Sequence, residues 1–152
     1  MATRSGFTIV IDSREQKPYR FRGALKAALP AGDYSAAGLE RRVAVERKTH
    51  ADCYSSVGAG RKRFEKEMKR LAAYDYAAIV IEAGLADFLR PPAHSRLHPH
   101  AAVNTLVSWS VKYGVHVFFA GSRRLARGLT YRIIEKFCKH RAAGTLAAGN
   151  GP

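Results

Sequence analysis

Three apolar runs have the length and the boundaries of buried β-strands. They are "FTIVID" at 7–12, "AAIVIEA" at 77–83 and "VHVFFAG" at 115–121. Runs of about four to eight apolar residues between turn signals are typical of strands that are covered on both faces. The chain is therefore predicted to build a sheet around these three strands.

A β-hairpin is predicted around Gly38, with its strands at 33–36 and 43–48. Successive side chains of a strand point to opposite faces, so Glu46 and Lys48 share one face of the second strand. Asp33 begins the first strand and Glu46 lies late in the second. Antiparallel pairing of the strands would therefore bring these two carboxylates together.

Helical periodicity marks three longer segments, which we place at 60–74, 103–114 and 124–140. The first has an apolar face formed by Phe64, Met68, Leu71 and Ala72, and an opposite face that carries Lys62, Lys66, Lys69 and Arg70. The last has the apolar stripe Leu125, Leu129, Ile133 and Phe137. Strands that alternate with helices at these lengths predict an α/β sandwich around a mixed sheet.

The middle helical segment has more apolar surface than a sheet-covering helix needs. One face, which we expect to pack on the sheet, is formed by Val103, Leu106, Val107 and Val111. Trp109 and Tyr113 extend this surface sideways, and Trp and Tyr are enriched at protein interfaces. We therefore expect a homodimer with this helix at its seam; the alternative is that the C-terminal helix covers both aromatic side chains within one chain.

The domain organisation predicted from the sequence is simple. Residues 1–141 are expected to form a single domain, because the chain shows no repeat and no second set of elements. Residues 142–152 contain little that can pack and are expected to be a mobile tail.

The charge of the chain narrows the classes of partner. Twenty-six Lys and Arg against twelve Asp and Glu give a formal net charge of +14, so polyanions, above all nucleic acids, are the expected partners. Only Cys53 and Cys138 are present, without metal-ligand spacing, and no run approaches the roughly 20 apolar residues of a membrane span. We expect a cytoplasmic protein with no membrane partner and no small-molecule cofactor.

The predicted meeting of Asp33, Glu46 and Lys48 points to chemistry on phosphodiesters. A charged pair two apart on a strand is most often a surface ion pair, but here an apolar strand carries it and a second carboxylate lies opposite. Carboxylate oxygens suit Mg²⁺ or Mn²⁺, and a bound metal beside an ammonium group would activate water and stabilise charge on a phosphate.

Four ordered motifs resemble a known family. "GDY" followed by "VERKTHAD" resembles the GDx(n)ERKxxxD signature of the XPF-type structure-specific endonuclease domain, a branch of the PD-(D/E)xK nuclease superfamily. "IDSREQ", "SSVGAGRKRFEKEM" and "AIVIEA" resemble three further motifs of that domain, in the same order. The resemblance implies a restriction-endonuclease-like three-layer sandwich, in a compact stand-alone form similar to bacterial or phage relatives.

The resemblance also implies roles for individual residues. Asp33, Glu46 and the backbone carbonyl of Arg47 correspond to metal ligands, and Lys48 to the catalytic lysine. Asp12 and Glu15 are expected to belong to the catalytic set, although Asp12 also suits a turn at a strand end. The expected DNA-binding residues are Arg14, Arg61, Lys62, Arg63 and Lys66; for Arg14 and Arg61 the alternative is a structural salt bridge, and for the lysine stripe a solvated face. Asp52 suits the N-cap of the following helix better than a metal site.

The loop before the second helical segment contains His94, His98 and His100. A metal cluster is one interpretation, but no Cys or carboxylate completes it. We favour a loop that contacts phosphate together with Arg90 and Arg96.

The resulting hypothesis is a Mg²⁺- or Mn²⁺-dependent DNA endonuclease that cleaves phosphodiester bonds, with branched or single-strand/double-strand junction DNA as candidate substrates. In a bacterium it would associate with the nucleoid, and as a phage protein it would act in the host cytoplasm. The alternatives are a catalytically idle DNA-binding subunit of the same fold and a basic structural protein. The sequence leaves open whether a separate protein targets it.

Overall fold

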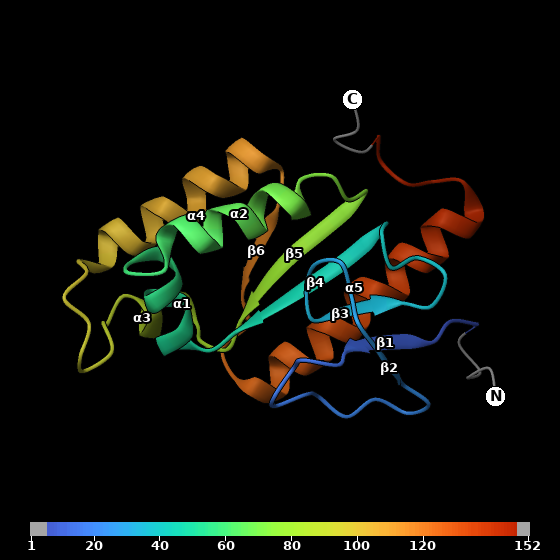
Figure 1. Ribbon diagram of the computed structural model, residues 1–152, viewed down its shortest axis with the longest axis horizontal. Helices are drawn as coiled ribbons and strands as arrows, with labels where there is room; N and C mark the ends of the chain where they lie inside the picture. The colour runs from blue at the N-terminus through green and yellow to red at the C-terminus, as the bar shows by residue number, and fades with distance from the viewer. Residues whose placement is uncertain (1–5, 149–152) are drawn as a thin grey trace.

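A mixed six-stranded sheet runs through the middle of the protein, with helices on both of its faces (Figure 1). The structure is a computed structural model, and it describes residues 6–148. The strand order is β2-β1-β3-β4-β5-β6. The strands are β1 (Ile9–Asp12), β2 (Leu25–Ala27), β3 (Tyr34–Ala36), β4 (Val43–Lys48), β5 (Tyr76–Ile81) and β6 (His116–Phe119).

Strand direction divides this sheet into two parts. β4, β5 and β6 are parallel to one another, whereas β3 is antiparallel to both of its neighbours, β1 and β4. The parallel part is the more buried one: β5 has five buried residues in succession, as expected for a strand covered on both faces. The predicted hairpin is therefore present, and it joins the two parts of the sheet.

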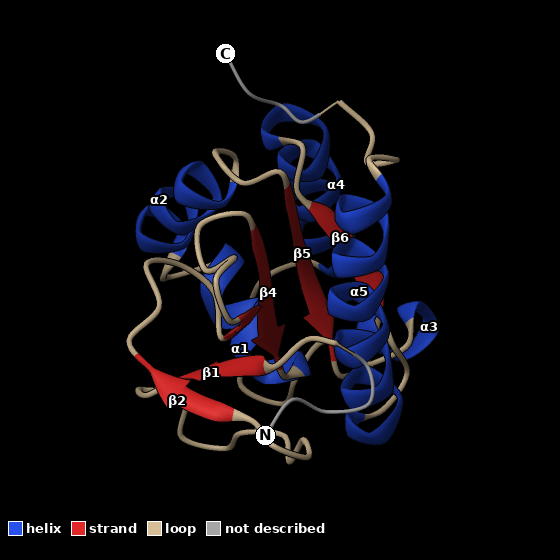
Figure 2. Ribbon diagram, turned by 90° about the vertical axis from the view of Figure 1, so that its right-hand side faces the viewer, coloured by secondary structure: helices blue, strands red, loops and turns tan. Residues whose placement is uncertain are grey.

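The helices form the two outer layers. They are α1 (His50–Val57), α2 (Arg61–Leu71), α3 (Leu85–Phe88), α4 (Pro99–Tyr113) and α5 (Arg123–Ala143). Residues of α1, α2 and α4 share one hydrophobic cluster with one face of the sheet, and residues of α5 share a second cluster with the other face. Figure 2 shows α5 and α2 on opposite sides of β4 and β5. The predicted three-layer α/β sandwich is confirmed.

The apolar face of α4 differs from the one predicted. Its buried residues are Ala102, Thr105, Leu106 and Trp109, whereas Val107 and Val111 are 55% and 81% exposed. Trp109 is only 4% exposed, and its ring packs against Phe64 of α2 at a centroid distance of 5.8 Å. The prediction of Trp109 as an exposed interface residue is wrong, because α2 and α4 lie side by side on the same face of the sheet. The helix that covers the Trp109 ring is α2, and not the C-terminal helix.

The buried stripe of α5 is also displaced by about one residue from the predicted one. Ala126, Thr130, Ile134 and Phe137 are buried, while Leu125 is 62% exposed. Leu129 and Ile133 pack at the edge of the cluster. A helix with apolar residues at both i and i+1 positions has two possible stripes, and contact with the sheet selects between them.

Four local features were missed or misassigned. β2 and α3 lie in segments for which no strand or helix was predicted, and α4 begins at Pro99 within the histidine-rich stretch. The N-cap of α1 is Thr49, whose Oγ1 accepts a hydrogen bond from the N–H of Asp52 at 3.1 Å. Asp52 is thus in the first turn of the helix, and its assignment as the N-cap is wrong.

The C-terminal helix extends past residue 141, where the domain was predicted to end. α5 continues to Ala143, where Gly144 ends it in a left-handed conformation with φ of 69°. Leu146 packs against the second cluster. The mobility expected for 142–152 stays a prediction, and its residues 149–152 lie outside the described part. None of the helices between residues 6 and 148 is long and apolar enough to cross a membrane.

Candidate active site

The pairing of β3 with β4 places Asp33 beside Glu46. Tyr34 pairs with Val45 across the two antiparallel strands, and the Asp33 N–H donates a 2.9 Å hydrogen bond to the Val45 carbonyl. The Asp33 carboxylate accepts a 2.8 Å bond from the backbone N–H of Arg47. Both the main chain and the side chain of Asp33 are therefore fixed by β4, as the predicted hairpin requires.

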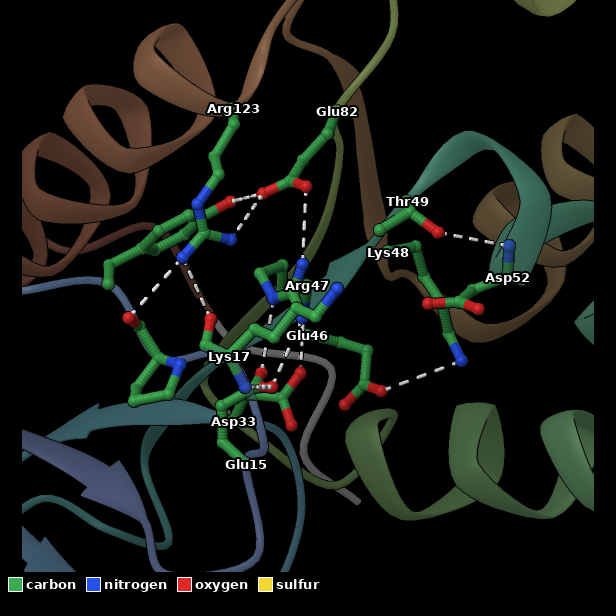
Figure 3. A network of polar contacts seen from close by, with 12 residues as sticks. Glu15, Lys17, Asp33, Glu46, Arg47, Lys48, Thr49, Asp52, Glu82 and Arg123 are labelled. Atoms are coloured by element: carbon green, nitrogen blue, oxygen red, sulfur yellow. Dashed lines mark hydrogen bonds and ion pairs between the residues drawn. The ribbon is translucent and has the colours of Figure 1, made fainter.

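Glu46 and Lys48 share the face of β4 that is turned towards α1 and α2, as the alternation of strand side chains predicts. The Lys48 ammonium lies 3.8 Å from a carboxylate oxygen of Glu46 and 4.8 Å from the centre of the Phe64 ring on α2. Figure 3 shows the Lys48 amine pointing away from the strand, with Glu46 below it. The two side chains are 15% and 18% exposed, so water and a ligand can reach them.

Burial changes the proton affinity of both carboxylates. It raises the pKa of Asp33 to about 7, with the bond from the Arg47 N–H opposing the rise and the charge of Glu15 adding to it. Burial also raises the pKa of Glu46 well above its usual value, and the neighbouring charge of Asp33 adds to this effect. Lys48 offsets the negative charge only in part, so the pair lacks a balancing cation.

The opposite face of β4 carries a network of buried charges around Arg47 (Figure 3). The guanidinium donates two hydrogen bonds of 3.2 Å to Glu15 and one of 3.2 Å to Glu82 at the end of β5. All three side chains are 8% exposed. Arg123 of α5 lies 3.3 Å from Glu82 and also binds the Lys17 carbonyl at 2.9 Å. This network joins β4, β5 and α5 directly behind the two carboxylates.

The Arg47 network explains the state of Glu15. Burial alone would raise the pKa of this carboxyl, but the hydrogen bond and the charge of Arg47, together with the backbone N–H groups of Lys17 and Gln16, outweigh burial and hold the pKa below its usual value. Glu15 is therefore a charged carboxylate whose contacts are those of a positioning residue. Its predicted catalytic role stays a prediction.

Asp12 and Arg14 form a second structural pair at the end of β1. Arg14 Nε lies 3.1 Å from the Asp12 carboxylate, and the same carboxylate accepts a 2.9 Å bond from the Leu29 N–H. Arg14 Nη2 also donates to the Leu29 carbonyl at 2.7 Å. The pair thus ties the loop before Asp33 to the end of β1, which is the salt-bridge alternative considered for Arg14.

A groove of about 1010 Å³ contains the carboxylates and runs between the strand ends and helices α1 and α2. Its acidic residues are Asp12, Glu15, Asp33, Glu46, Asp52 and Glu67, and its basic residues are Arg14, Lys17, Arg47, Lys48, Arg63, Lys66 and Arg70. Carboxylates at the centre with exposed cations around them suit a phosphate chain whose reacting phosphate lies over a metal ion.

Two of the predicted DNA-binding residues lie outside this groove. Lys62 is not among the residues that line it, and Arg61 faces α4 instead. The Arg61 guanidinium donates a 2.8 Å bond to Thr105 Oγ1 and lies 4.9 Å from the centre of the Trp109 ring. The Arg61 side chain therefore ties α2 to α4.

Among the charged residues of the groove, Lys17, Glu67 and Arg70 were not assigned to the site from the sequence. On α2, Arg63, Lys66, Glu67 and Arg70 follow the i, i+3, i+4, i+7 spacing of one helix face. That spacing was the available signal, because Glu67 is the acidic residue of an otherwise basic face. Glu82 was noted only as part of a motif, without a role.

The histidine-rich loop lies beside a smaller hollow of about 450 Å³ next to α1, lined in part by His94 and Arg96. His98 caps α4, because its Nδ1 accepts a 3.2 Å bond from the His100 N–H. Within residues 6–148, no three His, Cys, Asp or Glu side chains converge to hold a metal ion by themselves. A metal at the main site would therefore need backbone and water ligands besides its two carboxylates.

The backbone of Arg47 can supply one such ligand. Its N–H points to Asp33, and the N–H and C=O of one strand residue point to the same side. The donor set is then two carboxylates and one carbonyl, all hard oxygen atoms. Mg²⁺ and Mn²⁺ prefer such donors, and Mg²⁺ keeps several of its waters, so the residues present fit either ion.

Comparisons with known proteins agree with this geometry. The sequence profile of the ERCC4 domain matches residues 11–133. Two solved structures are similar in fold: XPF from Aeropyrum pernix, with a TM-score of 0.63 and 20% identity, and XPF from Aeropyrum pernix in complex with DNA, with a TM-score of 0.66 and 21% identity. They cover 89% and 93% of this chain, which in turn spans 65% and 68% of theirs. No curated protein sequence matches. The chain belongs to the ERCC4 domain family and has the fold of the XPF nuclease domain.

Proposed function

We propose that the protein is a divalent-metal-dependent endonuclease that hydrolyses phosphodiester bonds in DNA. The observation that carries this proposal is the position of Asp33, Glu46 and Lys48 together at the centre of a groove with cationic walls. The family is one of nucleases, and one of the similar structures is a complex with DNA. Both facts support the proposal.

Asp33, Glu46 and the Arg47 carbonyl would hold Mg²⁺ or Mn²⁺. When bound, the ion would lower the pKa of a water molecule and stabilise negative charge on the phosphate. The two carboxylates have raised pKa values because they are buried without a balancing cation. The site is therefore suited to a divalent ion, which would restore both groups to the charged form.

Lys48 would act on the reacting phosphate or on the attacking water. Its ammonium group carries three N–H donors, and only one contact with Glu46 is within ion-pair range. The remaining donors can orient a water molecule or a phosphate oxygen. In a partly closed groove, such a donor is worth more than in bulk water because the local dielectric constant is lower.

The walls of the groove would hold the DNA backbone. Arg63, Lys66 and Arg70 lie on one face of α2, and all three are exposed. Phosphate contacts of this kind give affinity and position the strand without reading its sequence. Branched or junction DNA as the substrate also belongs to this proposal.

A homodimer is part of the proposal as well, with a changed seam. Trp109 is buried within one chain, whereas Val107 and Val111 form an exposed apolar strip on the same helix. A dimer through α4 would therefore use the two valines. Exposed apolar side chains in one strip are a feature of protein interfaces.

A plasmid-nicking assay tests the proposed activity. We expect supercoiled DNA to be nicked in Mg²⁺ or Mn²⁺ and not in EDTA. We expect Glu46→Gln and Lys48→Met each to lower the nicking rate by at least about 100-fold, because loss of one transition-state contact typically costs that much. DNA binding should persist in both variants. Binding without metal-dependent nicking by the unaltered protein would favour the catalytically idle subunit.

A further inference from the structure

Glu67 is a carboxylate on a helix face that is otherwise basic. Arg63, Lys66 and Arg70 share this face of α2, and Glu67 lies among them in the groove, with a side chain that is 19% exposed. Glu67 is one of six carboxylates in the groove, and it adds repulsion between like charges near Asp33 and Glu46. Such a residue needs a compensating contact.

Both oxygens of Glu67 have partners. Oε1 accepts a 3.0 Å hydrogen bond from the backbone N–H of Gly32, and Oε2 accepts a 2.7 Å bond from Arg70. The bond to Gly32 crosses from the helix layer to the turn that immediately precedes Asp33. The bond to Arg70 holds the carboxylate in place from the other side.

The turn at Gly32 leaves little freedom of its own. Gly32 has φ of 76°, and a Cβ there would lie 3.0 Å from Ala44 Cβ and 3.3 Å from the Val45 carbonyl oxygen. The turn thus packs directly against β4, in a conformation that only glycine adopts without strain. The next peptide N–H, that of Asp33, is bound to the Val45 carbonyl.

Asp33 is therefore held from three directions. β4 binds its main-chain N–H and its carboxylate, the Asp12 N–H of β1 donates a 2.8 Å bond to its carbonyl, and Glu67 binds the peptide N–H one residue earlier. Without Glu67, the Gly32 N–H would lose its side-chain acceptor, and the turn would lose this tie to α2. A metal ligand requires its neighbours to fix its position, and loss of such a neighbour typically weakens metal binding by about 10- to 100-fold.

We propose that Glu67 is a positioning residue: by accepting the Gly32 N–H, it fixes the turn that presents Asp33 to the metal ion. This inference rests on the proposed metal-dependent function. It assigns to α2 two tasks, because the same helix face would hold DNA phosphates and the turn of the metal site. Gln can accept the same hydrogen bond, whereas Ala and Met cannot.

The test measures Mn²⁺ affinity by calorimetry on the unaltered protein, Glu67→Ala, Glu67→Gln and the control Glu65→Ala. Glu65 is two residues away on α2, but it accepts a 2.7 Å bond from Tyr113 outside the groove. We expect Glu67→Ala to weaken Mn²⁺ binding by roughly 10-fold or more, Glu67→Gln to stay within about 3-fold of the unaltered protein, and Glu65→Ala to have no effect. Glu67→Met keeps side-chain length and helix propensity, and replaces Glu67→Ala if the latter does not fold.

Unchanged Mn²⁺ affinity in Glu67→Ala or Glu67→Met would overturn the inference. Equal losses of affinity in Glu67→Gln and Glu67→Ala would also overturn it, because the negative charge rather than the hydrogen bond would then matter.

Hydrogen exchange of the Gly32 amide gives a readout that does not need metal. It should be slow in the unaltered protein and in Glu67→Gln, and faster in Glu67→Ala. If the unaltered protein binds no Mn²⁺ while the Gly32 amide behaves as expected, the proposed function fails and the Glu67 contact stands.

Discussion

The carboxylate of Asp33 accepts a 2.8 Å hydrogen bond from the backbone N–H of Arg47, the residue that follows Glu46 in β4. β3 begins only at Tyr34. The Arg47 N–H of β4 therefore has no backbone acceptor on β3, and the Asp33 carboxylate accepts it instead. One bond therefore sets the position of one carboxylate relative to the other. The same residue, Arg47, turns its side chain to the opposite face of the sheet and its buried ion pairs.

The metal-free protein should lose stability as pH rises. Burial raises the pKa of Asp33 to about 7 in the folded state, above the value near 3.9 of an unfolded chain. Between these values the folded state binds more protons than the unfolded state, so the contribution of Asp33 is full below pH 4 and is lost as pH rises through about 7. We expect Asp33→Asn to reduce this loss and to raise the melting temperature at pH 8 in EDTA by a few degrees, measured by circular dichroism.

Divalent metal should reverse the effect in the unaltered protein only. Mg²⁺ or Mn²⁺ at pH 8 should raise its melting temperature and leave that of Asp33→Asn nearly unchanged, because binding to the folded state alone is stabilising. Glu65→Gln, outside the groove, serves as a control for non-specific ion effects. A metal-induced rise of equal size in Asp33→Asn would contradict the assignment of Asp33 as a ligand.

DNA affinity should depend on the groove face of α2. Binding should weaken as salt is added. The logarithm of the binding constant should fall with the logarithm of the salt concentration, with a slope of about −0.9 per phosphate neutralised on duplex DNA. Replacing Arg63 and Lys66 by Gln should flatten this slope by about two units. The matched pair Lys62→Gln and Lys69→Gln lies on the same helix but does not line the groove, so its slope should change less. Fluorescence anisotropy over a salt series measures both.

Equal slopes for the two α2 variants would show that the groove does not select the path of the DNA. In that case the basic residues of the helix would act only through the net charge of the protein, which is +14. This outcome would also weaken the assignment of the groove as the DNA site.

The Arg47 network should be needed for stability rather than for metal binding. Arg47→Met leaves Glu15 buried without its ion-pair partner and leaves Glu82 with Arg123 and the Tyr19 hydroxyl alone, and loss of one member of a buried ion pair costs about 3–5 kcal/mol. The double variant Glu15→Gln with Glu82→Gln keeps the shape but removes both buried negative charges, so combining it with Arg47→Met should recover part of the loss. Urea unfolding curves of the three proteins give the comparison.

The outline of this site could be predicted from the sequence because local pattern determines it. Strand alternation places Glu46 and Lys48 on one face, and the hairpin spacing brings Asp33 to them. Local pattern contains no information about contacts between distant segments. Glu82 reaches Arg47 across β4 and β5, and Glu67 reaches Gly32 across 35 residues; only the packing of α2 and β5 against β4 establishes these contacts.

The same limit applies to helix faces. α4 has apolar side chains on more than one side, so the periodicity alone allowed Val107 or Trp109 to be the buried residue. The neighbouring α2, with Phe64 and Arg61, decides in favour of Trp109. Single-stripe helices such as α2 were predicted correctly, because only one orientation buries Phe64, Met68 and Leu71.

The homodimer is the last prediction, and its seam follows from the observed orientation of α4. Val107 and Val111 are four residues apart on this helix and 55% and 81% exposed, so a second copy could bury both. We expect light scattering at micromolar concentration to give twice the monomer mass of 16.7 kDa. Val107→Asp with Val111→Asp should halve the measured mass, because burying a charge without a partner is unfavourable. The far-ultraviolet circular dichroism of this variant should stay unchanged.

Leu125→Asp changes an exposed leucine on α5; it is the control and should leave the mass doubled. A monomer mass for the unaltered protein would contradict the dimer, and a doubled mass that the valine variant retains would move the seam away from α4.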